Sequence, residues 1–132
     1  AFLRAMQAHD LAGVRAALDD DFSFVDHRRT GLGRVDGADD YVASVAALVE
    51  QSEDFATDVL YHVAVAEHGS LSVGRTFGTL RGGGPFESVF VRLNRYEGGR
   101  NVGTELFEVE DLERAKRRFE ELGREHAARG GG

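Results

Sequence analysis

"MQAHDLAGVRAALDDDFSFVD", residues 6–26, is the stretch that indicates the fold most specifically. We expect Asp10 to be a helix N-cap, because an aspartate side chain can accept hydrogen bonds from the free N–H groups of a first helical turn. Apolar residues recur at helical spacing behind it, at Leu11, Val14 and Leu18. Together with the residues before it, this stretch predicts two short helical pieces within residues 2–22.

The spacing of apolar residues then changes, and this change predicts a strand over residues 22–27. Successive side chains of a strand point to opposite sides, so Phe22, Phe24 and Asp26 share one face. A carboxylate therefore follows two phenylalanines toward the expected core. Its role is the first question that the sequence raises.

A loop rich in glycine and charge, residues 28–37, separates this strand from the next helix. We expect that helix over residues 36–51, with Asp36 as its cap. One stripe of the helix is apolar, and it consists of Ala38, Val42, Val45 and Val49.

Strand-like alternation returns after residue 55 and continues over four stretches. They are residues 56–70, 71–84, 85–99 and 100–110, and they end in turn compositions such as "RGGGP" and "YEGGR". Such short connections force antiparallel neighbours, because a parallel crossover needs a dozen residues or more. A last helix is expected over residues 110–127, with an apolar stripe of Leu112, Ala115, Phe119 and Leu122.

This order of elements predicts an α+β fold with its helices segregated to one face of the sheet. We expect one domain over residues 1–129 and a flexible glycine tail over 130–132. Glycines at 74, 78 and 103 lie inside strands and indicate bends. A bent sheet around a helix leaves a cone-shaped cavity. Because the chain begins within a turn of its first helix, we expect either that this helix is trimmed or that the chain is one domain cut from a longer protein.

Composition narrows the class of protein. The net charge is −7 and the one basic cluster is "RAKRR" at 114–118, so we expect neither nucleic acid nor an anionic membrane as a partner. The chain has no cysteine, which excludes disulfides, thiolate zinc sites and a cysteine nucleophile. No apolar run approaches the roughly 20 residues of a membrane span, and we expect a cytoplasmic protein.

The stretch 6–26 and the order of elements resemble the SnoaL-like branch of the NTF2-like superfamily, which includes ketosteroid isomerases, polyketide cyclases and limonene epoxide hydrolases. The resemblance covers nearly the whole chain. Its most specific part is the helical pair with Asp10, the "DDD" at 19–21 and the acid four residues after Phe22. It implies an NTF2-like cone, with a curved antiparallel sheet wrapped around the N-terminal helices, a C-terminal helix, and a homodimer formed through the outer sheet face.

The resemblance also implies a role for Asp26. In ketosteroid isomerases the acid at this position is the base that moves a proton, and burial among phenylalanines would raise the pKa of such a carboxylate toward neutrality. The oxyanion donors of those enzymes have no counterpart, because Phe2 and, within a residue, Val91 stand at the matching positions. The alternative is that Asp26 pairs with Arg28 or Arg29 or caps a turn.

Four further strand residues are candidates for chemistry, namely His62, Arg75, Arg92 and Glu105. His62 is a candidate acid or hydrogen-bond donor in the cavity, and the alternative is a core or interface histidine. Arg75 or Arg92, combined with Asp26 and Glu105, resembles the arginine between two carboxylates that epoxide hydrolases of this superfamily use to position water. The alternative is that these charges form cross-strand ion pairs on the outer sheet face or at a dimer interface.

Aromatic residues supply a candidate apolar lining for the cavity, although such positions are also typical of plain core. They are Phe24, Tyr41, Phe77, Phe90 and Phe107. The five histidines have no ligand-like spacing, so we expect no metal and no cofactor.

The sequence thus predicts a pocket for a small, largely apolar molecule. If there is chemistry, we expect cofactor-independent isomerisation, cyclisation or hydration with Asp26 as general base and His62 or an arginine assisting. The alternative function is a non-catalytic ligand-binding or dimerisation module of a larger regulatory protein.

Overall fold

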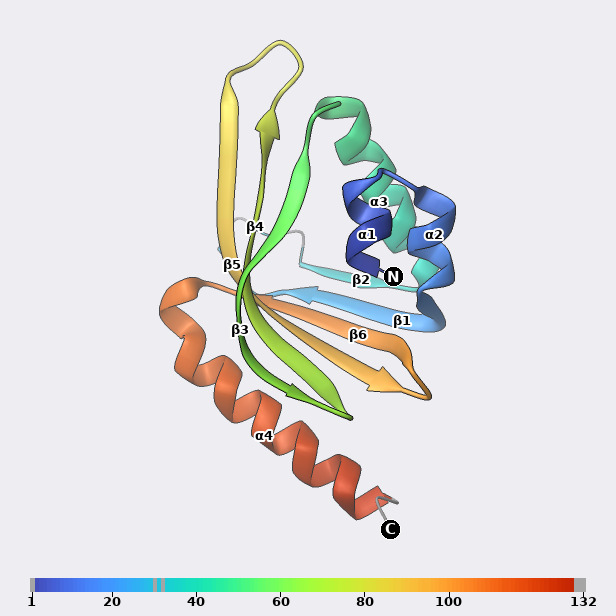
Figure 1. The fold of residues 1–132 in the computed structure, drawn as a ribbon, viewed down its shortest axis with the longest axis vertical. Coiled ribbons are helices and arrows are strands. Elements are labelled where there is room, and N and C mark those ends of the chain that lie inside the picture. The colour runs from blue at the N-terminus through green and yellow to red at the C-terminus, as the bar shows by residue number, and fades with distance from the viewer. Residues whose placement is uncertain (1, 30, 32, 130–132) are drawn as a thin grey trace.

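Helices at both ends of the chain flank a six-stranded sheet in the computed structural model, which describes residues 2–29, 31 and 33–129 (Figure 1). The predicted tail over 130–132 lies outside the described residues. In chain order the elements are α1 (Phe2–Gln7), α2 (Leu11–Ala16), β1 (Leu18–Asp26), β2 (Arg34–Asp36), α3 (Ala38–Gln51), β3 (Ala56–Ala66), β4 (Gly69–Thr79), β5 (Pro85–Glu97), β6 (Arg100–Phe107), a 3-10 turn (Val109–Asp111) and α4 (Leu112–Arg129).

The sheet has the strand order β2-β1-β6-β5-β4-β3. The predicted hairpins are confirmed, since β3, β4, β5 and β6 pair antiparallel with their neighbours along the chain. The expectation of a wholly antiparallel sheet is wrong, because β1 pairs parallel with β6. These two strands are joined through β2, α3 and three successive hairpin connections, so no tight turn fixes their relative direction.

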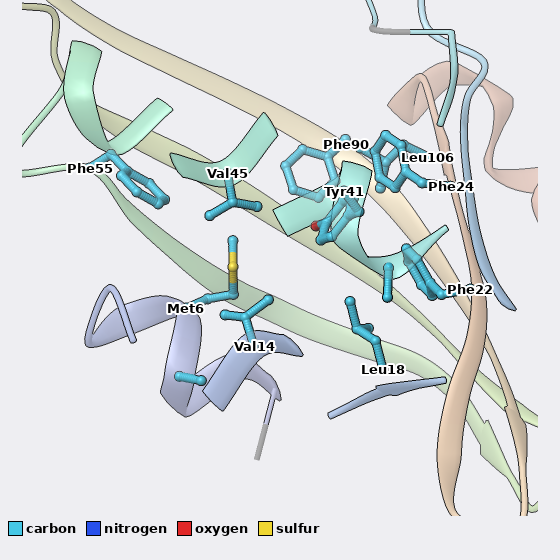
Figure 2. Close-up of a cluster of buried hydrophobic side chains, with 12 residues drawn as sticks. Met6, Val14, Leu18, Phe22, Phe24, Tyr41, Val45, Phe55, Phe90 and Leu106 are labelled. Atoms are coloured by element: carbon cyan, nitrogen blue, oxygen red, sulfur yellow. The ribbon is translucent and has the colours of Figure 1, made fainter. Parts of the chain in front are cut away.

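The sheet buries a different cluster on each of its faces. On the concave face, α1, α2 and α3 pack against the aromatic side chains of β1 and β5, as Figure 2 shows for Phe22, Phe24, Tyr41 and Phe90. On the convex face, α4 covers a second cluster that includes Leu71, Val91 and Phe107. The expectation that all helices share one face is therefore wrong. The predicted stripe of α4 accounts for this result, because its residues pack against the second cluster.

Of the predictions for individual residues before α3, the one for Asp10 is confirmed, and those for Leu18 and Asp36 are wrong. Asp10 is the N-cap of α2, and its carboxylate accepts a hydrogen bond from the backbone N–H of Gly13 at 3.0 Å. Leu18 is not helical, because α2 ends at Ala16 and Leu18 begins β1 opposite Asn101. Asp36 is not the cap of α3. It belongs to β2, where its carboxylate accepts from Arg34, and Gly37 with a φ of 92° precedes the helix instead.

A bend in the sheet shapes the concave side. The register of β3 against β4 shifts between Val59 and Tyr61 and again between His62 and Ala64. Gly74 lies opposite Val59, where a Cβ atom would meet the carbonyl oxygen of Asp58 at 2.9 Å. The bulges and this close backbone approach bend β3 and β4 beside the N-terminal helices. In Figure 1 both strands are strongly curved, and β4 begins beside α4.

Candidate functional site

A cavity of about 520 Å³ lies between the N-terminal helices and the concave face of β3, β4, β5 and β6. Its apolar wall includes Phe2, Leu3, Val59 and Phe90. The volume lies within the range of typical small-molecule pockets, which is about 300–1,000 Å³. The remaining lining residues are Ala16, Ala17, Thr57, Asp58, His62, Ser70, Ser72, Gly74, Arg92, Asn94, Tyr96, Gly99, Arg100 and Asn101.

Arg92 brings a positive charge into this cavity from the middle of β5. Its guanidinium lies 5.4 Å from the ring centroid of Phe2 and 5.9 Å from that of Phe90. Within the part of the chain that the structure describes, this guanidinium makes no hydrogen bond and no ion pair with a side chain. Both distances are within the range of a cation–π contact, and such contacts leave the N–H donors of the guanidinium available.

Beyond Arg92, side-chain hydrogen bonds connect three strands in a polar network. Asn94 accepts from the hydroxyl of Thr104 at 2.8 Å and donates to the hydroxyl of Ser70 at 3.2 Å. The hydroxyls of Ser70 and Tyr96 lie 3.1 Å apart. Asn101 donates to both Asn94 and Thr104. These mutual bonds satisfy the buried polar atoms and give the apolar cavity one polar region.

His62, a predicted site residue, lines the cavity on β3 and is exposed to solvent. It stands in one row of cross-strand partners that runs over the concave side of the sheet. The row is His62, Ser72, Arg92, Leu106 and Asp26. With neighbouring strands about 4.8 Å apart, two strand spacings separate Arg92 from His62 and from Asp26. The row therefore brings the predicted His62, Arg92 and Asp26 to one side of the sheet without direct contact between them.

Asp26 has the buried position that the alternation predicts, with only 1% of its side chain exposed. The Arg28 guanidinium donates two hydrogen bonds to it, from Nε to Oδ1 at 2.9 Å and from Nη2 to Oδ2 at 2.8 Å. The backbone N–H of Arg28 also donates to Oδ1. The hydrogen bond to Asp26 is the main cause that raises the pKa of Arg28 above its usual value. Asp26 is not one of the described residues that line the cavity.

The Arg28 side chain continues this arrangement onto β5. Its Nη1 donates to the hydroxyl of Ser88 at 2.7 Å, and the guanidinium lies 5.2 Å from the ring centroid of Phe90. The alternative that the sequence left open for Asp26, pairing with Arg28, is thus present in the structure.

Arg75, a predicted site residue, does not belong to this row. It pairs across the strands with Asp58 at 3.2 Å and with Glu87 at 3.1 Å, and its guanidinium lies 4.2 Å from the ring centroid of Phe77. Its partner on β5 is Val89, on the side opposite to Phe90 and Arg92. This is the alternative arrangement, a cross-strand network on the outer sheet face.

Glu105 and Phe107 also lie on the side of the sheet that α4 covers. The carboxylate of Glu105 lies 2.9 Å from Nε2 of His27 and accepts from Nε of Arg118 at 3.3 Å. The ring of His27 stacks on Phe107, and Phe107 belongs to the cluster under α4. These residues hold α4 to the sheet, so the predicted grouping of Glu105 with Asp26 and an arginine is not present.

Of the five aromatic residues predicted as lining, Phe90 alone is among the described residues that line the cavity. Phe24 and Tyr41 are buried core with ring centroids 5.1 Å apart. Phe77 borders a separate open depression near the β4–β5 turn. Of the two positions that lack oxyanion donors, Phe2 lines the cavity, whereas Val91 faces the cluster under α4.

Sequence reasoning missed Ser72, Asn94, Tyr96 and Arg100 as lining residues. The signal for two of them was available, because residues 90, 92, 94 and 96 alternate onto one face of β5. Across the described ranges, no group of three or more His, Asp or Glu side chains could hold a metal ion. No helix formed by these residues has the length and apolar character that a membrane span requires.

Comparison with known proteins identifies the family. The model of the SnoaL-like domain family matches residues 1–117. This chain belongs to the SnoaL-like family. No curated protein matches it.

Solved structures confirm that the SnoaL-like chain has the NTF2-like fold. An NTF2-like protein of unknown function from Burkholderia pseudomallei is 23% identical, with a TM-score of 0.67 over 88% of this chain and 89% of that chain. A protein with a ketosteroid isomerase-like fold from Catenulispora acidiphila, solved in complex with trimethylamine, is 16% identical, with a TM-score of 0.70 over 85% of each chain. A protein from Sinorhizobium meliloti assigned as a polyketide cyclase is 14% identical, with a TM-score of 0.66 over 80% of this chain and 89% of that chain.

Proposed function

We propose that this SnoaL-like domain binds a small, largely apolar molecule in its concave cavity. The cavity itself is the observation that carries the proposal, since about 520 Å³ of space has an apolar wall and a few convergent polar groups. Phe2 and Phe90 offer flat apolar surfaces, and the Asn94 network offers hydrogen bonds at one end. The structure of the Catenulispora acidiphila protein with trimethylamine supports small-molecule binding by this fold.

Fluorescence titration with N-phenyl-1-naphthylamine, a neutral apolar probe, tests this proposal. The variant Ser72→Phe places a ring in the cavity, because Ser72 is a buried lining residue. The matched variant Ala66→Phe adds the same ring at an exposed position outside the lining. We expect Ser72→Phe to weaken probe binding at least tenfold and Ala66→Phe to change it less than twofold. Equal affinities in both variants would contradict the proposal, provided that circular dichroism shows both to be folded.

Acid–base chemistry is the catalytic form of this proposal. Asp26 remains the candidate general base, and His62 and Arg92 are two of the titratable or charged residues that line the cavity itself. Turnover of a panel of apolar ketones and epoxides, followed by NMR, would test it. Under this form, Asp26→Asn abolishes turnover of a substrate found in the panel while the domain stays folded. Turnover unchanged in Asp26→Asn would refute the role of Asp26.

The non-catalytic module is a second candidate function, and the ion pair of Asp26 favours it. Both carboxylate oxygens of Asp26 accept from Arg28, an arrangement that suits a structural acid. Under this form the panel yields ligands but no products. A large loss of stability in Asp26→Asn, without any activity to lose, would support the module.

The homodimer is also part of the proposal. Tyr61 is 52% exposed and Val89 is 38% exposed, beside the Arg75 ion-pair network on the outer sheet face. We expect sedimentation equilibrium to give twice the chain mass and Val89→Arg to give a monomer. A monomer at all concentrations of the unmodified chain would refute the dimer.

A further inference from the structure

Arg92 differs from Arg28, Arg75 and Arg118, because nothing among the described side chains neutralises it. Arg28 pairs with Asp26, Arg75 pairs with Asp58 and Glu87, and Arg118 pairs with Glu105. Arg92 is half-buried, and its described contacts are the rings of Phe2 and Phe90. A partly desolvated cation with free donors favours an anionic partner.

The other charges of the cavity do not supply that partner. Three charged residues occur among the described lining, namely Asp58, Arg92 and Arg100. The carboxylate of Asp58 accepts from Arg75 at 3.2 Å, in the ion-pair network of the outer face. Arg100 donates to the backbone carbonyl of Leu18 at 2.6 Å, and its charge also acts on the carboxylate of Asp20, whose pKa it helps to lower. The cavity therefore has an excess of positive charge, although the whole chain has a net charge of −7.

The position of Arg92 also fits the shape of an amphiphilic ligand. On β5 it stands between Phe90 and Asn94 on the same face, so an apolar surface lies on one side and an amide on the other. A guanidinium can donate two parallel hydrogen bonds to one anionic group. The apolar body of a ligand would then lie against Phe2 and Phe90.

We propose that the ligand of this cavity is an organic anion, an apolar ring system with one carboxylate or comparable anionic group, and that Arg92 binds this group. The inference rests on the proposed function, because it assumes that the cavity is the binding site. It specifies the chemical class of the ligand and the residue that selects it.

Two probes with the same skeleton separate the inference from the proposed function. N-phenyl-1-naphthylamine is neutral, and 1-anilinonaphthalene-8-sulfonate adds one sulfonate to it. The variant Arg92→Met removes the guanidinium and keeps an apolar side chain. The matched variant Arg124→Met makes the same change in net charge at an exposed position of α4, outside the described lining.

We expect Arg92→Met to weaken binding of the anionic probe about tenfold or more, as the loss of a charge-assisted hydrogen bond implies. Binding of the neutral probe should change less than twofold, and Arg124→Met should change neither probe by more than twofold. Arg92→Lys retains the charge but cannot donate two parallel hydrogen bonds to one anionic group, so it should lose an intermediate amount of affinity for the anionic probe.

Equal effects of Arg92→Met on both probes, or no effect on the anionic probe, would overturn the inference. The same holds if the unmodified chain binds the neutral probe and not the anionic one, and in that case the proposed function stands. If neither probe binds, both the proposed function and the inference fail. If Arg92→Met does not fold, the two probes are compared in Arg92→Lys instead. A loss of affinity for the anionic probe alone then supports the inference, and equal effects on both probes, or no effect on the anionic probe, overturn it.

Discussion

Replacing Asp26 by asparagine tests the structural account of this acid most sharply. The substitution keeps the shape of the side chain and removes its charge. In the structure, Oδ1 accepts from Nε and the backbone N–H of Arg28, and Oδ2 accepts from Nη2 at 2.8 Å. An asparagine amide can replace one of the two oxygens. At the other position its NH₂ group would face a guanidinium N–H, which places two donors against each other.

The expected cost follows from the burial of the two side chains. Asp26 is 1% exposed and Arg28 is 20% exposed, so the remaining guanidinium would be poorly solvated. Breaking a buried pair by removal of one partner costs about 3–5 kcal/mol, and the partial exposure of Arg28 reduces this to about 2–4 kcal/mol. For a chain of this length, 1 kcal/mol corresponds to roughly 3–4 °C, so the melting temperature should fall by about 10 °C.

Urea unfolding followed by circular dichroism at 222 nm measures this loss, since the chain has no tryptophan for fluorescence. Arg28→Met and the double variant complete a double-mutant cycle. The double variant should be more stable than the sum of the two single losses predicts, by about 1–2 kcal/mol, because it leaves no unpaired charge. A loss below about 0.5 kcal/mol in Asp26→Asn, or additive losses in the cycle, would refute the reasoning.

Three further substitutions test the packing of the sheet, the attachment of α4 and the hydrogen bond from the backbone N–H of Thr79 to the carboxylate of Asp54. Gly69→Ala should destabilise the chain by about 1–3 kcal/mol in urea unfolding, because its Cβ would overlap the carbonyl oxygen of Asn94, whereas Gly84→Ala, with nothing within 4 Å of its Cβ, should cost little. Glu105→Gln should lower the free energy of unfolding by about 1 kcal/mol, because Glu105 is 13% exposed and binds both His27 and Arg118. The control Glu113→Gln changes a carboxylate that is 76% exposed and should leave the free energy of unfolding almost unchanged. Equal losses in the two variants would contradict the role of Glu105 in holding α4 to the sheet. The backbone N–H of Thr79 lowers the pKa of Asp54 below its usual value, so the stabilisation by this carboxylate is present at neutral pH and is lost as pH falls through the lowered pKa. Thermal melts from pH 7 to pH 2 should therefore show a deficit of Asp54→Asn that shrinks with acid, and a deficit that does not depend on pH would contradict this assignment.

Local signals predicted most of the fold. The Asp10 cap indicated the two N-terminal helices, although the second ends before Leu18, and the alternation after residue 55 with the glycine-rich turns placed four antiparallel strands correctly. The parallel pairing of β1 with β6 was not predictable from such signals, because it joins segments more than 70 residues apart. The face covered by α4 was not predictable either, since an apolar stripe indicates that a helix packs and not where it packs.

The candidate site was harder to predict than the fold, because its residues come from different strands. Alternation along β5 correctly placed Phe90 and Arg92 on one face. Whether Arg75 of β4 shares that face depends on the register of the hairpin, in which Arg75 opposes Val89 and Ser72 opposes Arg92. The two register shifts around His62 also disturb the alternation of β3. A register shift of one residue moves every side chain of a strand to the opposite face of the sheet. The sequence could therefore indicate candidate residues but could not show which of them lie on the same face.

Chemical-shift mapping of the ¹⁵N-labelled chain with 1-naphthol, a small neutral aromatic compound, tests the central claim most directly. The account predicts saturable shifts at the amides of Gly74, Asn94 and Gly99, which line the cavity. Tyr61 and Val89 on the outer sheet face should not shift with the same saturation curve. Shifts confined to the outer face, or no saturable shifts among the lining residues, would contradict the claim that this cavity binds small apolar molecules.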